Sequence, residues 1–126
     1  MEQKATLIGI APQLVVADVV KTAEYYRDIL GFNIIGYAGT PPVYAMVERD
    51  GFQVHFGKAD TQSIHTNEAI RKGTSDLIIW VPEIDLFYAE LTSKHADITQ
   101  EIVKRVYGSR EFMIRDCDGH LILIGD

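Results

Sequence analysis

Residues 14–32, LVVADVVKTAEYYRDILGF, decide the fold because they hold an apolar strand, a helix start and a helix end in succession. Asp18 suits a helix N-terminus, where its carboxylate can accept backbone N–H groups. Apolar residues then recur with the spacing of an amphipathic helix, and Gly31 is typical of a helix C-cap. This stretch predicts a strand that leads directly into a helix packed behind a sheet.

The same order of elements recurs in the second half of the chain. The first strand is expected at residues 8–16; its counterpart at 77–81 precedes Glu83 and a second amphipathic helix. Three short strand-like runs follow each helix. They cover residues 32–37, 43–48 and 52–56 in the first half, and 98–103, 111–115 and 120–124 in the second. We therefore predict a single α+β domain of two βαβββ modules, approximately residues 6–57 and 75–126, joined by a linker at 58–74.

The composition excludes several classes of partner and location. The net charge is −6 and the sequence pI about 5.1, which argues against a nucleic-acid partner because phosphate binding needs clustered Lys and Arg. No apolar run approaches the ~20 residues of a membrane span, and the start, MEQKAT, lacks the features of a secretory signal. With Cys117 as the one cysteine, we expect a soluble cytoplasmic protein.

Alternation along the strands sorts their side chains onto two faces. One face is uniformly apolar and is expected to receive the helices. Its members are Leu14, Val16, Val54, Phe56, Leu77, Ile79, Val81, Ile122 and Ile124.

The opposite face is apolar with polar insertions. Gln13, Gln53, His55 and Asp76 fall on it, together with Trp80. Unpaired polar groups are costly to bury, at about 1–3 kcal/mol each. A largely apolar ligand cavity with a few convergent polar groups would explain them. The alternative is that the four polar side chains bond to one another, to water or to a second subunit.

Two motifs resemble those of a known family. Tyr25-Tyr26-Arg27-Asp28-Ile29-Leu30-Gly31-Phe32 is similar to the helix end "F/Y-Y-x-x-x-L-G-F" of glyoxalase/bleomycin-resistance/extradiol-dioxygenase proteins. Residues 108–122, GSREFMIRDCDGHLI, resemble the family's closing "G-x-R-E-F-x-x-x-D-P-D-G-N-x-I". The resemblance implies a U-shaped mixed sheet, with helices on its outer face, that holds a divalent metal or an organic ligand, often in a homodimer. Members range from lyases and dioxygenases to metal-free binding proteins, so the fold leaves the function open.

The family's metal-ligand positions fall on Ala11, His55, Asp76 and Leu123. Ala11 and Leu123 cannot coordinate a metal, and a catalytic site usually needs about three protein ligands. We therefore expect no metal and no other cofactor. Of the other candidates, His120 is expected at the surface beside a turn, and Cys117 carries no motif of a nucleophile.

These residues predict a metal-independent protein that binds a small aromatic or amphipathic organic molecule over Trp80. The expected ligand-binding residues are Gln13, Gln53, His55, Asp76, Trp80 and Phe112, with Tyr44 and Tyr107 as further walls. The alternative is a lyase, isomerase or dioxygenase with a degenerate metal site, in which His55 is the best catalytic candidate. A third possibility is a dimerisation module without a cavity. We expect a homodimer, because the sheets should leave free edges or an open cup.

Overall fold

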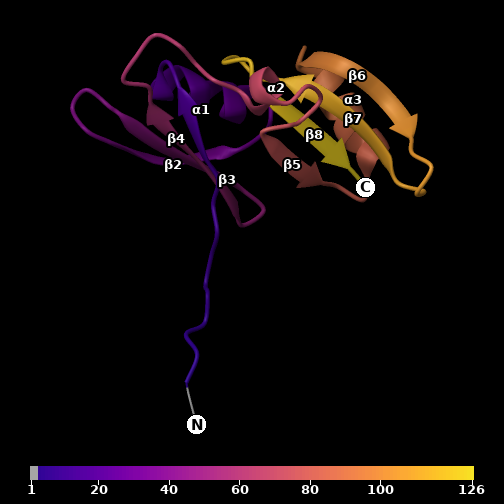
Figure 1. Ribbon diagram of the computed structural model, residues 1–126, viewed down its shortest axis with the longest axis horizontal. Coiled ribbons are helices and arrows are strands. Elements are labelled where there is room, and N and C mark those ends of the chain that lie inside the picture. Colours follow the sequence, from indigo (N-terminus) through magenta and orange to yellow (C-terminus); the bar gives the residue numbers. More distant parts are fainter. Residues whose placement is uncertain (1–2) are drawn as a thin grey trace.

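The computed structural model describes residues 3–126, which form two four-stranded sheets, each with a helix on one side (Figure 1). The first sheet, sheet A, has the strand order β1-β4-β3-β2, and the second, sheet B, has the order β5-β8-β7-β6. The elements are β1 (Gln13–Val16), α1 (Val19–Asp28), β2 (Asn33–Ala38), β3 (Tyr44–Arg49), β4 (Phe52–Lys58), α2 (Asn67–Ile70), β5 (Leu77–Trp80), α3 (Ile84–Ser93), β6 (Asp97–Lys104), β7 (Arg110–Arg115) and β8 (Leu121–Gly125).

The two sheets repeat one topology, which confirms the predicted α+β fold of two βαβββ modules. In each, the first strand runs parallel to the last and the remaining neighbours are antiparallel. Within residues 3–126, β1 and β5 are each paired on one side only. Each module therefore ends in a free strand edge.

Local chemistry explains where α1 begins and ends. The Asp18 carboxylate accepts the backbone N–H groups of Val20 and Lys21 at 3.1 and 3.2 Å, so Asp18 is the predicted N-cap. Gly31 follows the helix with φ of +74°, a left-handed conformation that glycine adopts without steric cost. The chain then turns directly into β2.

One apolar core lies under both helices. The predicted helix-facing residues of β1, β4 and β8 are buried, and those of β5 and Val81 pack against the same cluster. From the helices, Val19, Ala23 and Tyr26 of α1 and Ile84, Phe87 and Leu91 of α3 complete the core. The alternation of side chains along the strands therefore predicted the helix-facing side of the sheets correctly.

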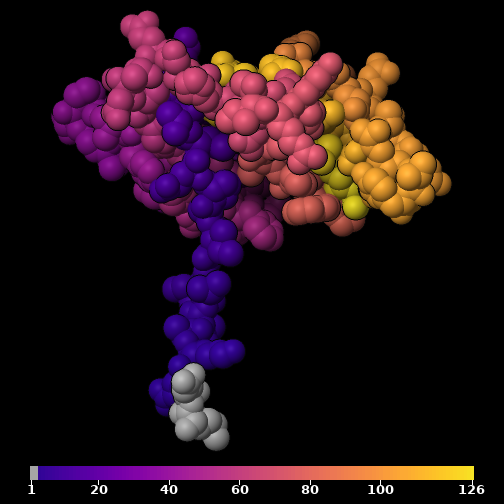
Figure 2. Space-filling view, in the orientation of Figure 1, coloured from indigo at the N-terminus to yellow at the C-terminus, as the bar shows by residue number. Residues whose placement is uncertain are grey.

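The first strand is shorter than predicted. Pairing with β4 begins at Gln13 opposite His55, so residues 8–12 are not part of the strand. Residues 3–12 form an extended arm that projects away from the body (Figures 1 and 2). Pro12 has no N–H to donate to a ladder, although its carbonyl accepts the N–H of His55 at 3.0 Å. No helix within residues 3–126 is long and apolar enough to cross a membrane.

Candidate functional site

The open face of sheet A, the side not covered by α1, carries a chain of four hydrogen-bonded polar side chains. Gln13 lies on β1, Tyr44 on β3, and Gln53 and His55 on β4. Nε2 of Gln13 lies 2.8 Å from the Tyr44 hydroxyl, which lies 2.6 Å from Nδ1 of His55. Nε2 of His55 lies 2.8 Å from Oε1 of Gln53. Three of the predicted ligand-binding residues are thus together and linked through Tyr44.

The donor and acceptor roles in this chain of hydrogen bonds follow from Gln53, the residue at one end of it. Oε1 of Gln53 only accepts, so Nε2 of neutral His55 carries the proton and donates to it. Nδ1 of His55 is then the acceptor for the Tyr44 hydroxyl, whose oxygen accepts from Gln13. Both ring nitrogens of His55 are engaged, so the imidazole orients its neighbours.

The Asp76 carboxylate makes hydrogen bonds to the backbone within the fold. Its Oδ1 accepts the N–H of Asn67 at 2.8 Å, at the start of α2, and its Oδ2 accepts the N–H of Leu121 at 3.0 Å. The carboxylate therefore holds the segment that joins the modules against the start of β8.

Phe112 lies in the core, away from both open faces. It is fully buried, with its ring centroid 4.9 Å from Tyr88 and 6.5 Å from Phe87 of α3. We leave Phe112 out of the candidate site, because a small molecule on the open face would not reach it.

Trp80 ends β5 on the open face of sheet B and is 71% exposed. A cavity of about 510 Å³ runs along β5 beside it, between α3 and the start of β4. Its walls are mainly apolar, with Phe52, Ile79 and Phe87 among the large side chains. We call it the β5 cavity. Its size lies within the usual range for small-molecule sites.

Gln53 connects the two features. It accepts from His55 in the polar chain, and it also lines the β5 cavity, as Trp80 does. Of the six predicted ligand-binding residues, Gln53 and Trp80 line this cavity. Gln13 and His55 are connected to Gln53 through the hydrogen bonds of the polar chain. The candidate site is therefore the β5 cavity with the polar chain at one side.

The residues at the family's metal positions do not fit a metal ion. Ala11 and Leu123 offer no ligand atom, and both oxygens of Asp76 already accept backbone N–H groups. The remaining position, His55, has both nitrogens in hydrogen bonds. A catalytic metal site needs about three available donors, which this set does not supply.

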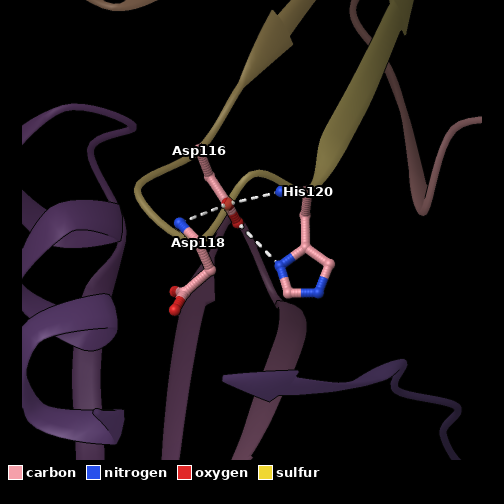
Figure 3. A group of neighbouring side chains, drawn as sticks. All are labelled: Asp116, Asp118 and His120. Carbon is pink, nitrogen blue, oxygen red and sulfur yellow. Dashed lines mark hydrogen bonds and ion pairs between the residues drawn. The ribbon is translucent and has the colours of Figure 1, made fainter. Parts of the chain in front are cut away.

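Over residues 3–126, one group of three potential ligands lies together: Asp116, Asp118 and His120, in the turn between β7 and β8 (Figure 3). Oδ1 of Asp116 accepts the N–H groups of Asp118 and His120, and Oδ2 accepts the Tyr26 hydroxyl at 2.8 Å. Asp118 accepts from the Ala17 N–H and from Thr22.

Bonds from the Ala17 N–H and from the hydroxyls of Thr22 and Tyr26 join these carboxylates to the first module, and the N–H groups of Asp118 and His120 close the turn itself. We call the group the inter-module clasp. Its hydrogen bonds within the turn and to the first module give it a structural role.

The prediction that His120 lies at the surface was wrong. The side chain is only 2% exposed, and its Nδ1 lies 3.4 Å from Oδ2 of Asp116, an ion-pair distance without hydrogen-bond alignment. Burial lowers the pKa of His120, but attraction to Asp116 outweighs it, with help from Asp76 and Asp118, and the pKa is raised. Packing between modules, which a single strand pattern does not contain, buries this residue.

Cys117 and Tyr26 also titrate outside their usual ranges. Burial, followed by the charge of Asp118, raises the pKa of the Cys117 thiol to about 12. Burial and Asp116 raise the pKa of Tyr26 well above its ordinary value. Both groups are therefore neutral at physiological pH, which agrees with the absence of a nucleophile motif around Cys117.

A second polar cluster, on the open face of sheet B, was missed by the sequence analysis. The nearly buried carboxylate of Glu111 pairs with Arg105, and the Tyr107 hydroxyl lies 3.4 Å from it. Arg105 also donates to Gln100 at 3.3 Å. Alternation along β7 could have indicated Glu111, because it precedes the helix-facing Phe112.

Comparison with known proteins agrees with this architecture. The sequence matches the Glyoxalase/Bleomycin resistance protein/Dioxygenase superfamily over residues 8–124. No protein of curated function matches it in sequence. Several solved structures share the fold at low identity.

TioX from Micromonospora sp. ML1 is 21% identical, with a TM-score of 0.74 over 94% of this chain and 97% of that one. The bleomycin-binding protein from Streptomyces verticillus, solved with copper(II)-bleomycin, is 22% identical, with a TM-score of 0.71 over 96% and 97%. A glyoxalase-related enzyme from Clostridium phytofermentans is 17% identical, with a TM-score of 0.76 over 98% of each chain. The repeated βαβββ topology and the match over residues 8–124 together establish that the chain belongs to the glyoxalase/bleomycin resistance protein/dioxygenase superfamily.

Proposed function

We propose that the protein is a metal-independent binding protein that sequesters a small aromatic or amphipathic compound in the β5 cavity. The main observation behind the proposal is a mainly apolar cavity of about 510 Å³ that is lined by both the exposed Trp80 and Gln53. Aromatic surface supplies affinity to a flat ligand, and the polar chain behind Gln53 supplies orientation.

Metal independence is supported by the donor set. Asp76 and His55 have their ligand atoms in internal hydrogen bonds, and the other two family positions are Ala11 and Leu123. A binding protein of this kind acts by lowering the concentration of its free ligand through mass action, so it needs no chemical step. The solved bleomycin-binding relative holds its ligand as copper(II)-bleomycin, which supports binding of an organic molecule on this fold.

We further propose a cytoplasmic homodimer. The lone Cys117 suits a reducing compartment. The free edges of β1 and β5 favour association with a second copy, since unpaired strand edges invite pairing.

The binding proposal is tested by titrating the protein with a panel of aromatic and amphipathic compounds while following Trp80 fluorescence. Trp80 is the single tryptophan, so its signal reports the cavity directly. A bound compound should change the emission and raise the melting temperature equally with and without divalent metals. Stabilisation that requires a metal would instead support the enzyme alternative.

Variants sharpen this test. Trp80→Ala should weaken binding by about 1–3 kcal/mol and leave the fold intact. Thermal shift or calorimetry measures this loss. Tyr107→Ala is the matched control, because Tyr107 is also 71% exposed and does not line the cavity. Equal losses in the two variants would contradict a site at Trp80.

A further inference from the structure

The β5 cavity carries charged side chains among its apolar walls. One cation, Arg49, and three carboxylates, Asp50, Glu83 and Glu90, line it, so the lining has a net charge of −2. The whole chain is acidic too, with a net charge of −6. A cavity lined mainly by one sign of charge attracts ligands of the opposite sign. The charges that are left unpaired then decide which ligand the cavity favours.

The positive charge of Arg49 is used within the fold. Its Nη1 donates to the Leu30 carbonyl at 2.8 Å and to Oε1 of Glu90 at 2.9 Å, and its Nη2 donates to Oε2 of Glu90 at 3.2 Å. The guanidinium lies 5.1 Å from the centroid of the Phe87 ring, and Nε lies 3.7 Å from a carboxylate oxygen of Asp50. Arg49 is therefore already paired and does not offer the cavity a free positive charge.

Glu83 has no such partner. It is exposed and occupies the N-cap position of α3, but its side chain does not accept the N–H groups there. Over residues 3–126 its carboxylate makes no ion pair, whereas Asp85, two residues later, pairs with Arg110 at 2.8 Å. Glu83 therefore brings an uncompensated negative charge to the lining of the cavity.

Trp80 supplies a second attraction for positive charge. Its ring is 71% exposed and lines the same cavity, three residues before Glu83 in the chain. The face of an indole ring is electron-rich and attracts cations, more strongly than the ring of Tyr or Phe. An organic cation suits this pair better than an inorganic ion, because its apolar body can also be buried against the cavity walls.

We propose that the ligand of the β5 cavity is an organic cation, with an aromatic body and an ammonium or amidinium group that lies between the Glu83 carboxylate and the Trp80 ring. The inference rests on the proposed function and narrows it from aromatic or amphipathic compounds to those with a positive charge. The apolar walls bury the body, and these two residues select the charge. Anionic aromatic compounds are disfavoured because they would meet an unpaired carboxylate.

The first experiment measures binding by equilibrium dialysis for sets of three probes that differ in their head group. Each set carries a trimethylammoniomethyl group, its uncharged carbon analogue neopentyl, or a methanesulfonate group on benzene, naphthalene or anthracene. We expect the cation to bind at least about tenfold more tightly than the sulfonate. Raising the salt concentration from about 20 to 500 mM should weaken binding of the cation and leave binding of the neopentyl compound unweakened, because salt screens charge.

The second experiment removes the charge of Glu83 and keeps the shape of the side chain. Glu83→Gln should weaken binding of the cationic probe at least about fivefold and that of the neutral probe by less than about twofold. Glu101→Gln is the matched control, because Glu101 is an exposed carboxylate on β6, outside the cavity, and also makes no ion pair over residues 3–126. It changes the net charge of the chain equally and should leave all the dissociation constants unchanged.

The third experiment tests the contribution of the indole ring. Trp80→Leu keeps apolar bulk at this position and removes the aromatic face. The variant should weaken binding of the cationic probe at least about threefold more than that of the neutral probe of the same shape. Equal losses for the two probes would remove Trp80 from the recognition of charge.

The outcomes separate this inference from the proposed function. A sulfonate that binds as tightly as the cation, or a Glu83→Gln variant that weakens the cationic and neutral probes alike, would overturn the cationic ligand and leave the binding function standing. Equal losses in Glu83→Gln and Glu101→Gln would assign the preference to the net charge of the chain and overturn the site at Glu83. Failure of all three sets to bind would overturn the proposed binding function, and this inference with it.

Discussion

Two histidines show how differently the two halves of the molecule use the same side chain. His55 lies on the open face of sheet A, with both ring nitrogens in a chain of hydrogen bonds to Tyr44 and Gln53. His120 is buried in the inter-module clasp, beside Asp116. The first orients groups around a cavity, and the second joins two modules.

This difference indicates that buried polar groups serve the stability of the fold, whereas polar groups on an open face are available for binding. On the open face, water can replace a lost partner, so each hydrogen bond contributes little to stability. In the clasp, Asp116 and His120 are buried, so an unpaired group beside them carries its desolvation cost. Stability and binding should therefore respond to substitutions in different parts of the molecule.

The largest expected effect is at Asp116. Asp116→Ala would leave two buried N–H groups and the Tyr26 hydroxyl without an acceptor, and should lower the free energy of unfolding by about 3–5 kcal/mol. Urea denaturation measures this change. The exposed carboxylate of Asp60 offers the control, because Asp60→Ala should change stability by no more than about 0.5 kcal/mol. Similar losses in both variants would show that the clasp does not join the modules.

Cys117 gives the next largest effect, on reactivity. Although the residue is exposed, its thiol has a pKa of about 12, so little thiolate exists at pH 8. Alkylation by iodoacetamide should be at least about a hundredfold slower in the native protein than in the unfolded chain. Asp118→Asn removes the second cause of the raised pKa, the charge of Asp118, and should therefore speed the alkylation of Cys117. Native and unfolded rates that agree would contradict the raised pKa of this thiol.

The fold was predictable from sequence where its signals are local. Asp18, Gly31 and the alternation of β1, β4 and β8 each act within a few residues, and the structure confirms them. The repeat of the same order then gave the two modules. These features need no knowledge of how the modules meet.

The site was less predictable because it depends on contacts between distant segments. Strand alternation placed Asp76 on the open face, but two backbone N–H groups from elsewhere in the chain hold its carboxylate. Phe112 was grouped with the cavity, yet it belongs to the face that packs under α3. The burial of His120 and the loss of strand pairing before Gln13 likewise follow from module packing and from Pro12.

The clasp should also make stability depend on pH. The pKa of His120 is raised in the folded state, so its stabilising contribution is fully present below the unfolded value of about 6.5 and is lost as pH rises through the folded pKa. The gap in unfolding free energy between wild type and His120→Gln should therefore shrink from pH 5.5 to 8.5. In an Asp116→Asn background the gap should vary much less. A gap that is constant with pH in the wild-type background would rule out this linkage.

The smallest effect is the most direct comparison of the two regions, because it removes one hydroxyl from each. Tyr26→Phe takes away a buried hydrogen bond to Asp116 and should cost about 1–3 kcal/mol in unfolding free energy. Tyr44→Phe takes away the link between Gln13 and His55 on a partly exposed face, and should cost less than about 1 kcal/mol. Ligand titrations should reverse the order: freeing Nδ1 of His55 loosens the orientation of Gln53 beside the β5 cavity, so Tyr44→Phe should weaken binding and Tyr26→Phe should not. Equal stability losses would mean that the open face is as inaccessible to water as the clasp, which would remove the physical basis for giving the polar chain a role in binding.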